Sequence, residues 1–177
     1  RNLRRMIKKY FAKLDENNIV TAVNVVNLED NASEEDGVNF LKNFYNEPNS
    51  VWKMTDKKTK LNVHSDGGTP FRGNFAVVGG SWDNVNNVFW GLKPYNSYLK
   101  DNSNYGWKAP VEYPSITQNA DEHLYFIFWD EENIRWHADL YSVTNPDYNE
   151  NGPDTRPYLK SETVYYWNPD NSTWNEI

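Results

Sequence analysis

Residues 129–136 read Trp129-Asp130-Glu131-Glu132-Asn133-Ile134-Arg135-Trp136, which places a tryptophan on each side of a polar turn. Hairpin loops of four or five residues are usually built around a type I turn, in which Asp and Asn are favoured. A tryptophan on each arm can then form a cross-strand pair that adds about 0.2–1 kcal/mol of stability. This stretch therefore predicts a β-hairpin closed by an aromatic clasp.

The same pattern recurs along the chain. Residues 82–90 and 167–174 again place two tryptophans around an Asn/Asp turn, residues 98–107 are a looser copy, and residues 10–27 form a hairpin pattern around Asp15-Glu16-Asn17-Asn18. The spacing of the copies is irregular, which indicates a recurring hairpin type and not a solenoid. We assign the role of structural aromatic clasp to Trp82, Trp90, Trp107, Trp129, Trp136, Trp167 and Trp174.

Composition agrees with many short strands joined by tight turns. Aromatic residues make up 16% of the chain, and it contains 26 Asn against a single Gln. Aromatic side chains suit pleated surfaces, whereas Asn, Asp, Gly and Pro suit turns. The sequence predicts a mainly β fold, rich in β-hairpins and arranged as a small sandwich or meander.

One short α-helix is expected near residues 34–45. Ser33 is a candidate N-cap with Asp36 three residues later, a weak form of the capping box, and Pro48 ends the segment. Apolar residues recur at helical spacing and are expected to face the core; they are Val38, Leu41, Phe44 and Tyr45. Residues 46–70 are polar and are expected to form an exposed loop or a weak hairpin.

The chain of 177 residues divides, on these patterns, into three parts. They are a basic arm over residues 1–9, a β-rich body over 10–114, and C-terminal hairpins over 115–177, packed on or beside the body. The longest strongly apolar run, Leu124–Trp129, is far short of the ~20 residues that span a bilayer. We expect a soluble chain without a signal peptide, and residues 1–5 are either a native start or a product of processing.

Charge is distributed unevenly. Residues 1–13 carry six Lys/Arg and no acid, a net charge of +6, while the remaining 12 basic and 25 acidic residues give −13. An acidic body repels phosphate backbones, so nucleic acid is not expected as a partner. We hypothesise that the arm binds an acidic protein surface; the alternative is a frayed, solvated terminus. The candidate partner-binding residues are Arg1, Arg4, Arg5, Lys8 and Lys9.

No catalytic or cofactor motif stands out. The chain has no Cys, its only glycine pairs lie on turns, and His64, His123 and His137 match no zinc spacing. The acidic runs 130–132 and 149–154 coincide with expected turns, where acids hydrogen-bond locally. We expect no enzyme, no cofactor and no metal site. Exposed Trp and Tyr could stack on sugar rings, and this alternative stays open.

Residues 71–114 resemble a known family. The pattern runs in order through Phe71-Arg72-Gly73-Asn74-Phe75-Ala76, Gly79, Trp82-Asp83, Lys93-Pro94-Tyr95, Ser97, Trp107, Ala109-Pro110-Val111 and Tyr113-Pro114. It is similar to small virion structural proteins of marine tailed bacteriophages, the cyanophages and their relatives. The resemblance extends to residues 10–45 and 165–177. The chain departs from the family at Gly91-Leu92, where members often carry two prolines, and between Ser115 and Thr163, which looks like an insertion.

The resemblance implies a structural role in a virus particle and supplies no catalytic residues. The expected function is that of a non-enzymatic virion protein that decorates the capsid in many copies or as a homo-oligomer, with other capsid or tail proteins as partners and no membrane contact. The alternative is a carbohydrate-binding or receptor-binding accessory protein of the tail. A glycosidase ranks third.

Overall fold

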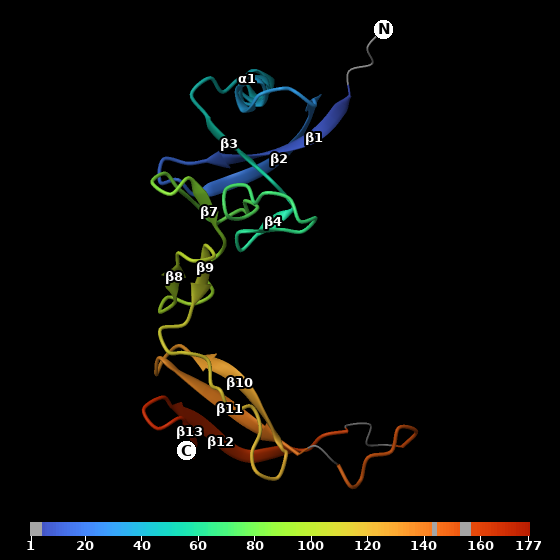
Figure 1. The fold of residues 1–177 in the computed structure, drawn as a ribbon, viewed down its shortest axis with the longest axis vertical. Helices are drawn as coiled ribbons and strands as arrows, with labels where there is room; N and C mark the ends of the chain where they lie inside the picture. Colours follow the sequence, from blue (N-terminus) through green and yellow to red (C-terminus); the bar gives the residue numbers. More distant parts are fainter. Residues whose placement is uncertain (1–4, 143–144, 153–156) are drawn as a thin grey trace. The chain divides into compact units, whose positions relative to one another are not determined.

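The computed structural model describes residues 5–142, 145–152 and 157–177, and in this part of the chain the fold is mainly antiparallel β with a single short helix, as predicted (Figure 1). Among these residues no helix is long and apolar enough to cross a membrane. The elements in chain order are β1 (Met6–Leu14), β2 (Val20–Glu29), α1 (Glu34–Tyr45), β3 (Val51–Thr55), β4 (Thr59–Lys60), β5 (Val63–His64), β6 (Ser81–Asp83), β7 (Val88–Trp90), β8 (Leu99–Asp101), β9 (Gly106–Lys108), β10 (Leu124–Asp130), β11 (Arg135–Tyr141), β12 (Lys160–Asn168) and β13 (Thr173–Glu176).

The chain divides into two compact units. The first contains the described residues through Pro94 together with Lys100–Lys108, and the second contains Tyr95–Leu99 and the described part of 109–177. This division assigns residues 109–114 to the second unit, whereas the sequence patterns had grouped them with the body.

The first unit is built on a three-stranded sheet in the order β2-β1-β3. The predicted hairpin over residues 10–27 is confirmed as β1–β2, and its turn is held by Asp15, whose Oδ1 accepts the N–H of Asn17 at 2.9 Å and of Ile19 at 2.8 Å. The strand begins at Met6, which pairs with Glu29. Residues 6–9 therefore belong to the sheet, and the expectation of a free arm over residues 1–9 is corrected there.

Helix α1 packs on this sheet and begins with the predicted capping box, since Ser33 Oγ accepts the Asp36 N–H at 3.1 Å and Asp36 Oδ2 accepts the Ser33 N–H at 2.7 Å (Figure 1). Leu41 is buried, but Phe44 is 69% exposed. The expectation that every apolar residue of the helix faces the core was wrong for Phe44 and for Tyr45, which is 43% exposed. The rings of Phe40, Phe44 and Tyr45 contact one another in series on the helix, and Tyr45 stacks on Trp52 of β3.

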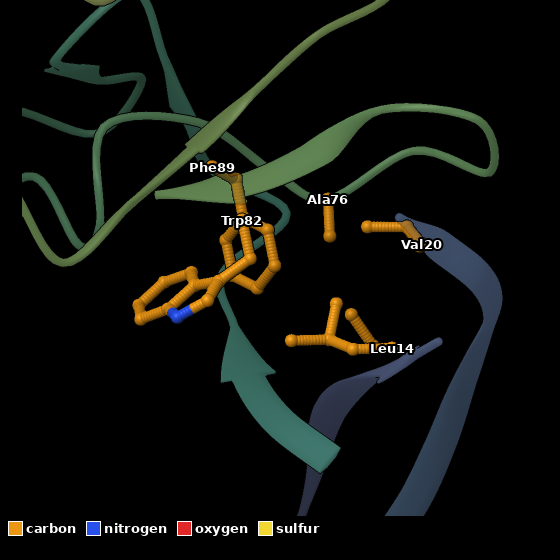
Figure 2. Packing of buried hydrophobic residues seen from close by; sticks show 6 residues of the cluster. Leu14, Val20, Ala76, Trp82 and Phe89 are labelled. Atoms are coloured by element: carbon orange, nitrogen blue, oxygen red, sulfur yellow. The ribbon is translucent and has the colours of Figure 1, made fainter. Parts of the chain in front are cut away.

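The segment 46–70 contains the weak hairpin that was one of its two expected forms, and in addition a strand that was not expected. Residues Val51–Thr55 form β3, which pairs with β1 from Tyr10↔Thr55 to Leu14↔Val51, and β4 and β5 form a short hairpin. Trp52 is 4% exposed and packs with Phe11 and Leu41 in one apolar cluster. A second cluster, shown in Figure 2, contains Ala12, Leu14, Val20, Ala76, Trp82 and Phe89.

Buried polar contacts tie the irregular segments of the first unit to its strands. Asn74 is buried, and its Nδ2 donates to Phe89 O at 2.8 Å and to Tyr105 O at 2.9 Å. The Arg72 guanidinium binds both Glu34 oxygens, Nη1 to Oε1 at 2.7 Å and Nη2 to Oε2 at 2.8 Å. These bonds satisfy polar groups that would otherwise be costly to bury.

The predicted clasps are confirmed in two hairpins and wrong in a third. Trp129 lies directly opposite Trp136, and Trp167 directly opposite Trp174, with ring centroids 5.0 and 5.2 Å apart. In β6–β7 the partners are Trp82↔Phe89 and Ser81↔Trp90. Trp90 instead packs against Tyr105 and Trp107.

Candidate interaction surfaces

The second unit carries a four-stranded sheet, in the order β10-β11-β12-β13, with one covered face. Trp129, Trp136 and Trp167 are buried there, together with the partly buried Ala109 and Val111. Two indole N–H groups fix the covering segment, Trp136 Nε1 donating to Val111 O at 3.0 Å and Trp174 Nε1 to Ile116 O at 2.7 Å. The tryptophans of this unit therefore stabilise its own fold, by packing on the covering segment and by hydrogen-bonding to it.

The opposite face of this sheet exposes large apolar side chains. Successive side chains of a strand point to opposite faces, so residues 124, 126 and 128 of β10 share the face that Trp129 does not occupy. Leu124, Phe126 and Phe128 are 44%, 64% and 38% exposed. We call this side of the sheet the open face. It contains Leu124, Phe126 and Phe128 of β10, with His137 and Asp139 opposite them on β11 and Lys160 on β12. Contiguous exposed apolar side chains mark interaction sites.

The ionisable side chains of the open face lie next to one another. His137, opposite Phe128, places its Nε2 3.0 Å from Asp130 Oδ2. Asp139, opposite Phe126, forms an ion pair of 2.7 Å with Lys160. Because these side chains partner each other, the apolar rings remain the main groups that the face offers to another molecule.

An aromatic groove opens beside the start of β10. It has a volume of about 580 Å³ and no charged residue in its lining. Burial, and to a lesser extent the charge of Glu176, raises the pKa of the Tyr125 phenol, so this ring stays neutral at physiological pH. The groove is suited to an apolar or aromatic ligand, or to the face of a sugar ring. Its lining residues are Tyr113, Thr117, Leu124, Tyr125, Phe126, Tyr141 and Tyr158.

A basic pocket lies at the other candidate surface, in the first unit. Pairing of Tyr10 with Thr55 brings the turn after β3 alongside the first half of β1. Lys8, Lys57 and Lys58 line the resulting pocket of about 320 Å³ together with Asp56 and the rings of Tyr10 and Phe71. Lys58 forms an ion pair with Asp66, so Lys8 and Lys57 provide the ammonium groups that a docked carboxylate can use. Lys57 Nζ lies 5.6 Å from the centroid of the Tyr10 ring. The pocket combines ammonium groups with aromatic walls and is suited to a carboxylate on an apolar partner.

Strand β1 also offers an open backbone edge at this pocket. The N–H of Met54 donates to Glu34 Oε1 at 2.6 Å and so points away from β1. Because backbone groups alternate along an antiparallel pair, Tyr10 and Lys8 direct theirs toward the β3 side. Strand β3 ends at Thr55, opposite Tyr10. Among the described residues no strand pairs with the Lys8 edge.

The five basic residues predicted to bind a partner have different surroundings in the structure. Arg1 and Arg4 lie outside the described residues. Arg5 is exposed, and its carbonyl accepts the Asp30 N–H at 2.9 Å. Lys8 is exposed at the pocket, whereas the ammonium group of Lys9 donates to the carbonyls of Asp30, at 3.1 Å, and Ala32. Lys9 is therefore engaged in holding the loop before α1.

Other sequence candidates turn out to be local. The run Asp130-Glu131-Glu132 lies at the β10–β11 turn, as predicted; Glu131 accepts hydrogen bonds from Ser97 N at 2.9 Å and Ser97 Oγ at 2.6 Å. In the run 149–154, residues 149–152 form a turn, while 153 and 154 lie outside the described residues. Within the described ranges no three His, Asp or Glu residues are grouped so as to hold a metal ion.

Sequence reasoning did not find Lys57 and Lys58 as part of the basic pocket. The signal present in the sequence is the run Lys57-Lys58-Thr59-Lys60, but its position beside β1 depends on a pairing between distant strands. The open face was also missed, although the alternation in Leu124–Asp130 is visible once Trp129 is assigned to the core.

The two units carry charges of opposite sign. Residues 95–99 and 109–177 contain 3 Lys/Arg and 13 Asp/Glu, a net charge of −10, whereas the rest of the chain contains 15 and 12, a net charge of +3. The aromatic surfaces thus belong to the acidic unit and the lysine pocket to the basic unit.

In comparisons with family models, curated proteins and solved structures, the chain matches none.

Proposed function

We propose that the chain is a non-enzymatic structural protein of a tailed-phage particle, present in many copies and decorating the capsid. The observation that carries the binding role is the open face, where Phe126 is 64% exposed in the middle of a regular strand. The resemblance of residues 71–114 to virion structural proteins supports the location. A folded domain that leaves such rings uncovered gains by burying them against another protein.

The distribution of tryptophan favours this role over sugar binding by exposed indoles. Six of the eight tryptophans are at most 9% exposed, and Trp107 and Trp174 are half-buried. Their N–H groups bond within the chain, as in Trp107 Nε1, which donates to Gly91 O at 2.9 Å. Tryptophan therefore contributes to the internal structure of each unit.

The test has two arms. Electron cryomicroscopy and quantitative mass spectrometry of the phage that carries the gene should find the protein on the particle in many copies. In the second arm, recombinant chain is co-sedimented with particles that lack it. Phe126→Ser/Phe128→Ser should weaken binding by about thirtyfold or more, the loss typical of a central interface residue. Absence of the protein from the particle would overturn the proposal.

A matched control separates binding from folding. Ile134→Ser removes an apolar side chain that is 43% exposed in the β10–β11 turn, at the end of the same hairpin. It should leave particle binding unchanged, and both variants should keep the circular dichroism spectrum of the parent. If Ile134→Ser weakens binding as much as the double variant, the open face is not the specific contact.

A second candidate function is supported by the aromatic groove. Four of its lining residues are tyrosines, namely Tyr113, Tyr125, Tyr141 and Tyr158, and tyrosine can both stack on a sugar and hydrogen-bond to it. A glycan array followed by calorimetric titration tests this function. Tyr158→Ala should abolish any binding that uses the groove, while Phe128→Ser should leave it unchanged, because Phe128 does not line the groove.

A further inference from the structure

The open face has the charge of its unit and therefore requires a partner of particular chemistry. Glu122 lies two residues before β10 and Glu132 lies in the turn that follows it, so exposed acidic residues stand before and after the row Leu124, Phe126 and Phe128 in the chain. The unit around them has a net charge of −10. A second copy of the same face would bring like charges together, which disfavours a face-to-face dimer.

The basic pocket provides the complementary surface. Met6, Lys8 and Tyr10 alternate with the residues of the other face of β1, and Met6 is 57% exposed. This row therefore offers an apolar side chain and an ammonium group, with Lys57 beside the Tyr10 ring. Methionine and lysine side chains both make favourable contacts with aromatic rings. The row matches phenylalanines flanked by carboxylates.

We infer that copies of the chain associate head to tail, with the basic pocket and β1 edge of one copy docked on the open face of the next. The inference rests on the proposed multi-copy role and identifies the partner of the open face as a second copy, so that this face holds each copy to the particle through its neighbour. The two docking surfaces differ, so the contact is heterologous, and repeated contacts give a ring or a chain of copies.

Two variants each remove one side of this contact. Lys8→Glu/Lys57→Glu reverses the charge of two residues at the pocket, and Glu122→Lys/Glu132→Lys reverses the charge of the two acidic residues at the ends of the open face. At about 100 μM the parent should sediment as assemblies larger than a monomer, since a contact of micromolar Kd is then largely occupied. Each variant alone should be monomeric, with self-association at least about tenfold weaker. The parent assemblies should also weaken as salt rises.

The decisive sample is an equimolar mixture of the two variants. The pocket variant keeps an intact open face and the face variant keeps an intact pocket, and the reversed pocket and reversed face are again opposite in charge. The mixture should therefore recover assembly that neither variant shows alone, as measured by sedimentation velocity. Lys93→Glu/Lys108→Glu, the same change in net charge at exposed lysines of the first unit outside the pocket, should assemble like the parent.

Several outcomes would overturn the inference. A parent chain that is monomeric at this concentration would do so, and so would a mixture that stays monomeric. If the pocket variant alone still dimerises while the face variant does not, the contact is face to face. The proposed function fails separately, if the protein is absent from the particle or if Phe126→Ser/Phe128→Ser binds particles normally. A parent chain that binds particles but does not assemble in solution contradicts only the inference.

Discussion

The two units contain similar hairpins but differ in how the faces of their sheets are covered. In the first unit, helix α1 and β3 close an apolar cluster over β1, and buried polar bonds from Asn74 and Arg72 hold the connecting loops. In the second unit, one face of the sheet is covered and the other leaves Phe126 exposed. Both units expose aromatic rings, Phe44 on helix α1 and Phe126 on β10, but the first unit packs apolar clusters on both faces of its sheet whereas the second packs one on a single face.

The largest expected effect tests that contrast directly. Phe11 is fully buried, so Phe11→Ala should destabilise the first unit by about 3–5 kcal/mol through lost burial and a cavity. Phe126→Ala removes an equally large ring but should change stability by only about 0.5 kcal/mol, as for other surface substitutions. Denaturant unfolding followed by circular dichroism measures both. Similar losses in the two variants would mean that the open face is part of the folding core.

Helix packing in the first unit provides the next test. A Cβ added at Gly37 would lie 2.2 Å from Phe11 Cζ, and Phe11 is fully buried, so its ring or the helix must shift to accept the methyl group. Gly37→Ala should therefore cost about 1–3 kcal/mol through overpacking, despite the higher helix propensity of alanine. Gly91→Ala is the control, because a Cβ there meets nothing within 4 Å. Its melting temperature should match that of the parent.

Tryptophan coupling should distinguish the hairpins. A double-mutant cycle on Trp129 and Trp136 should give a coupling free energy of about 0.5–1.5 kcal/mol, because their rings touch. The same cycle on Trp82 and Trp90 should give a clearly smaller value, since each ring packs with other partners. Thermal unfolding of the single and double variants supplies the measurements. Equal coupling in both hairpins would restore the original clasp interpretation for β6–β7.

The number of positions between the two tryptophans explains why they pair in one hairpin and not in the other. Trp129 and Trp136 are seven positions apart, which a four-residue turn places opposite each other. Trp82 and Trp90 are eight apart, so the same turn pairs Trp82 with Phe89 and directs the two indoles to opposite faces. Attention to the parity of the spacing would have predicted this result.

Other features could not be obtained from local patterns. The hairpins and the capped helix depend on neighbours in sequence and were predicted, whereas β3 is a strand only because it joins the far edge of β1 about 40 residues away. The basic pocket depends on that same pairing. The open face depends on which side of β10 the segment around Val111 covers, and this choice is made by tertiary packing.

The smallest effect concerns a hydrogen-bonding turn shared by the two units. In β6–β7, Asn86 donates its side-chain amide to Asp83 Oδ2 at 2.9 Å and its backbone N–H to Asp83 Oδ1 at 3.0 Å. These bonds are the main reason that the pKa of Asp83 falls from 3.8 to about 2. In β10–β11, burial raises the pKa of Asp130, but the same two hydrogen bonds from Asn133, together with the nearby His137 and Arg135, lower it more, so that the pKa of Asp130 is also lowered.

Because the folded pKa of Asp83 is the lower one, its carboxylate stabilises the fold fully above about pH 4 and this stabilisation is lost as the pH falls toward 2. Asn86→Ala should raise the pKa of Asp83 toward 3.8, make this loss shallower, and reduce stability at pH 7 by about 1 kcal/mol, the usual worth of a hydrogen bond. Carboxyl-carbon NMR measures the titration. The β12–β13 turn is the control, since Asn168 occupies the equivalent position and does not titrate, so Asn171→Ala should leave the pH profile unchanged. An Asp83 that titrates near 3.8 in the parent would show that the shared turn does not hold its carboxylate.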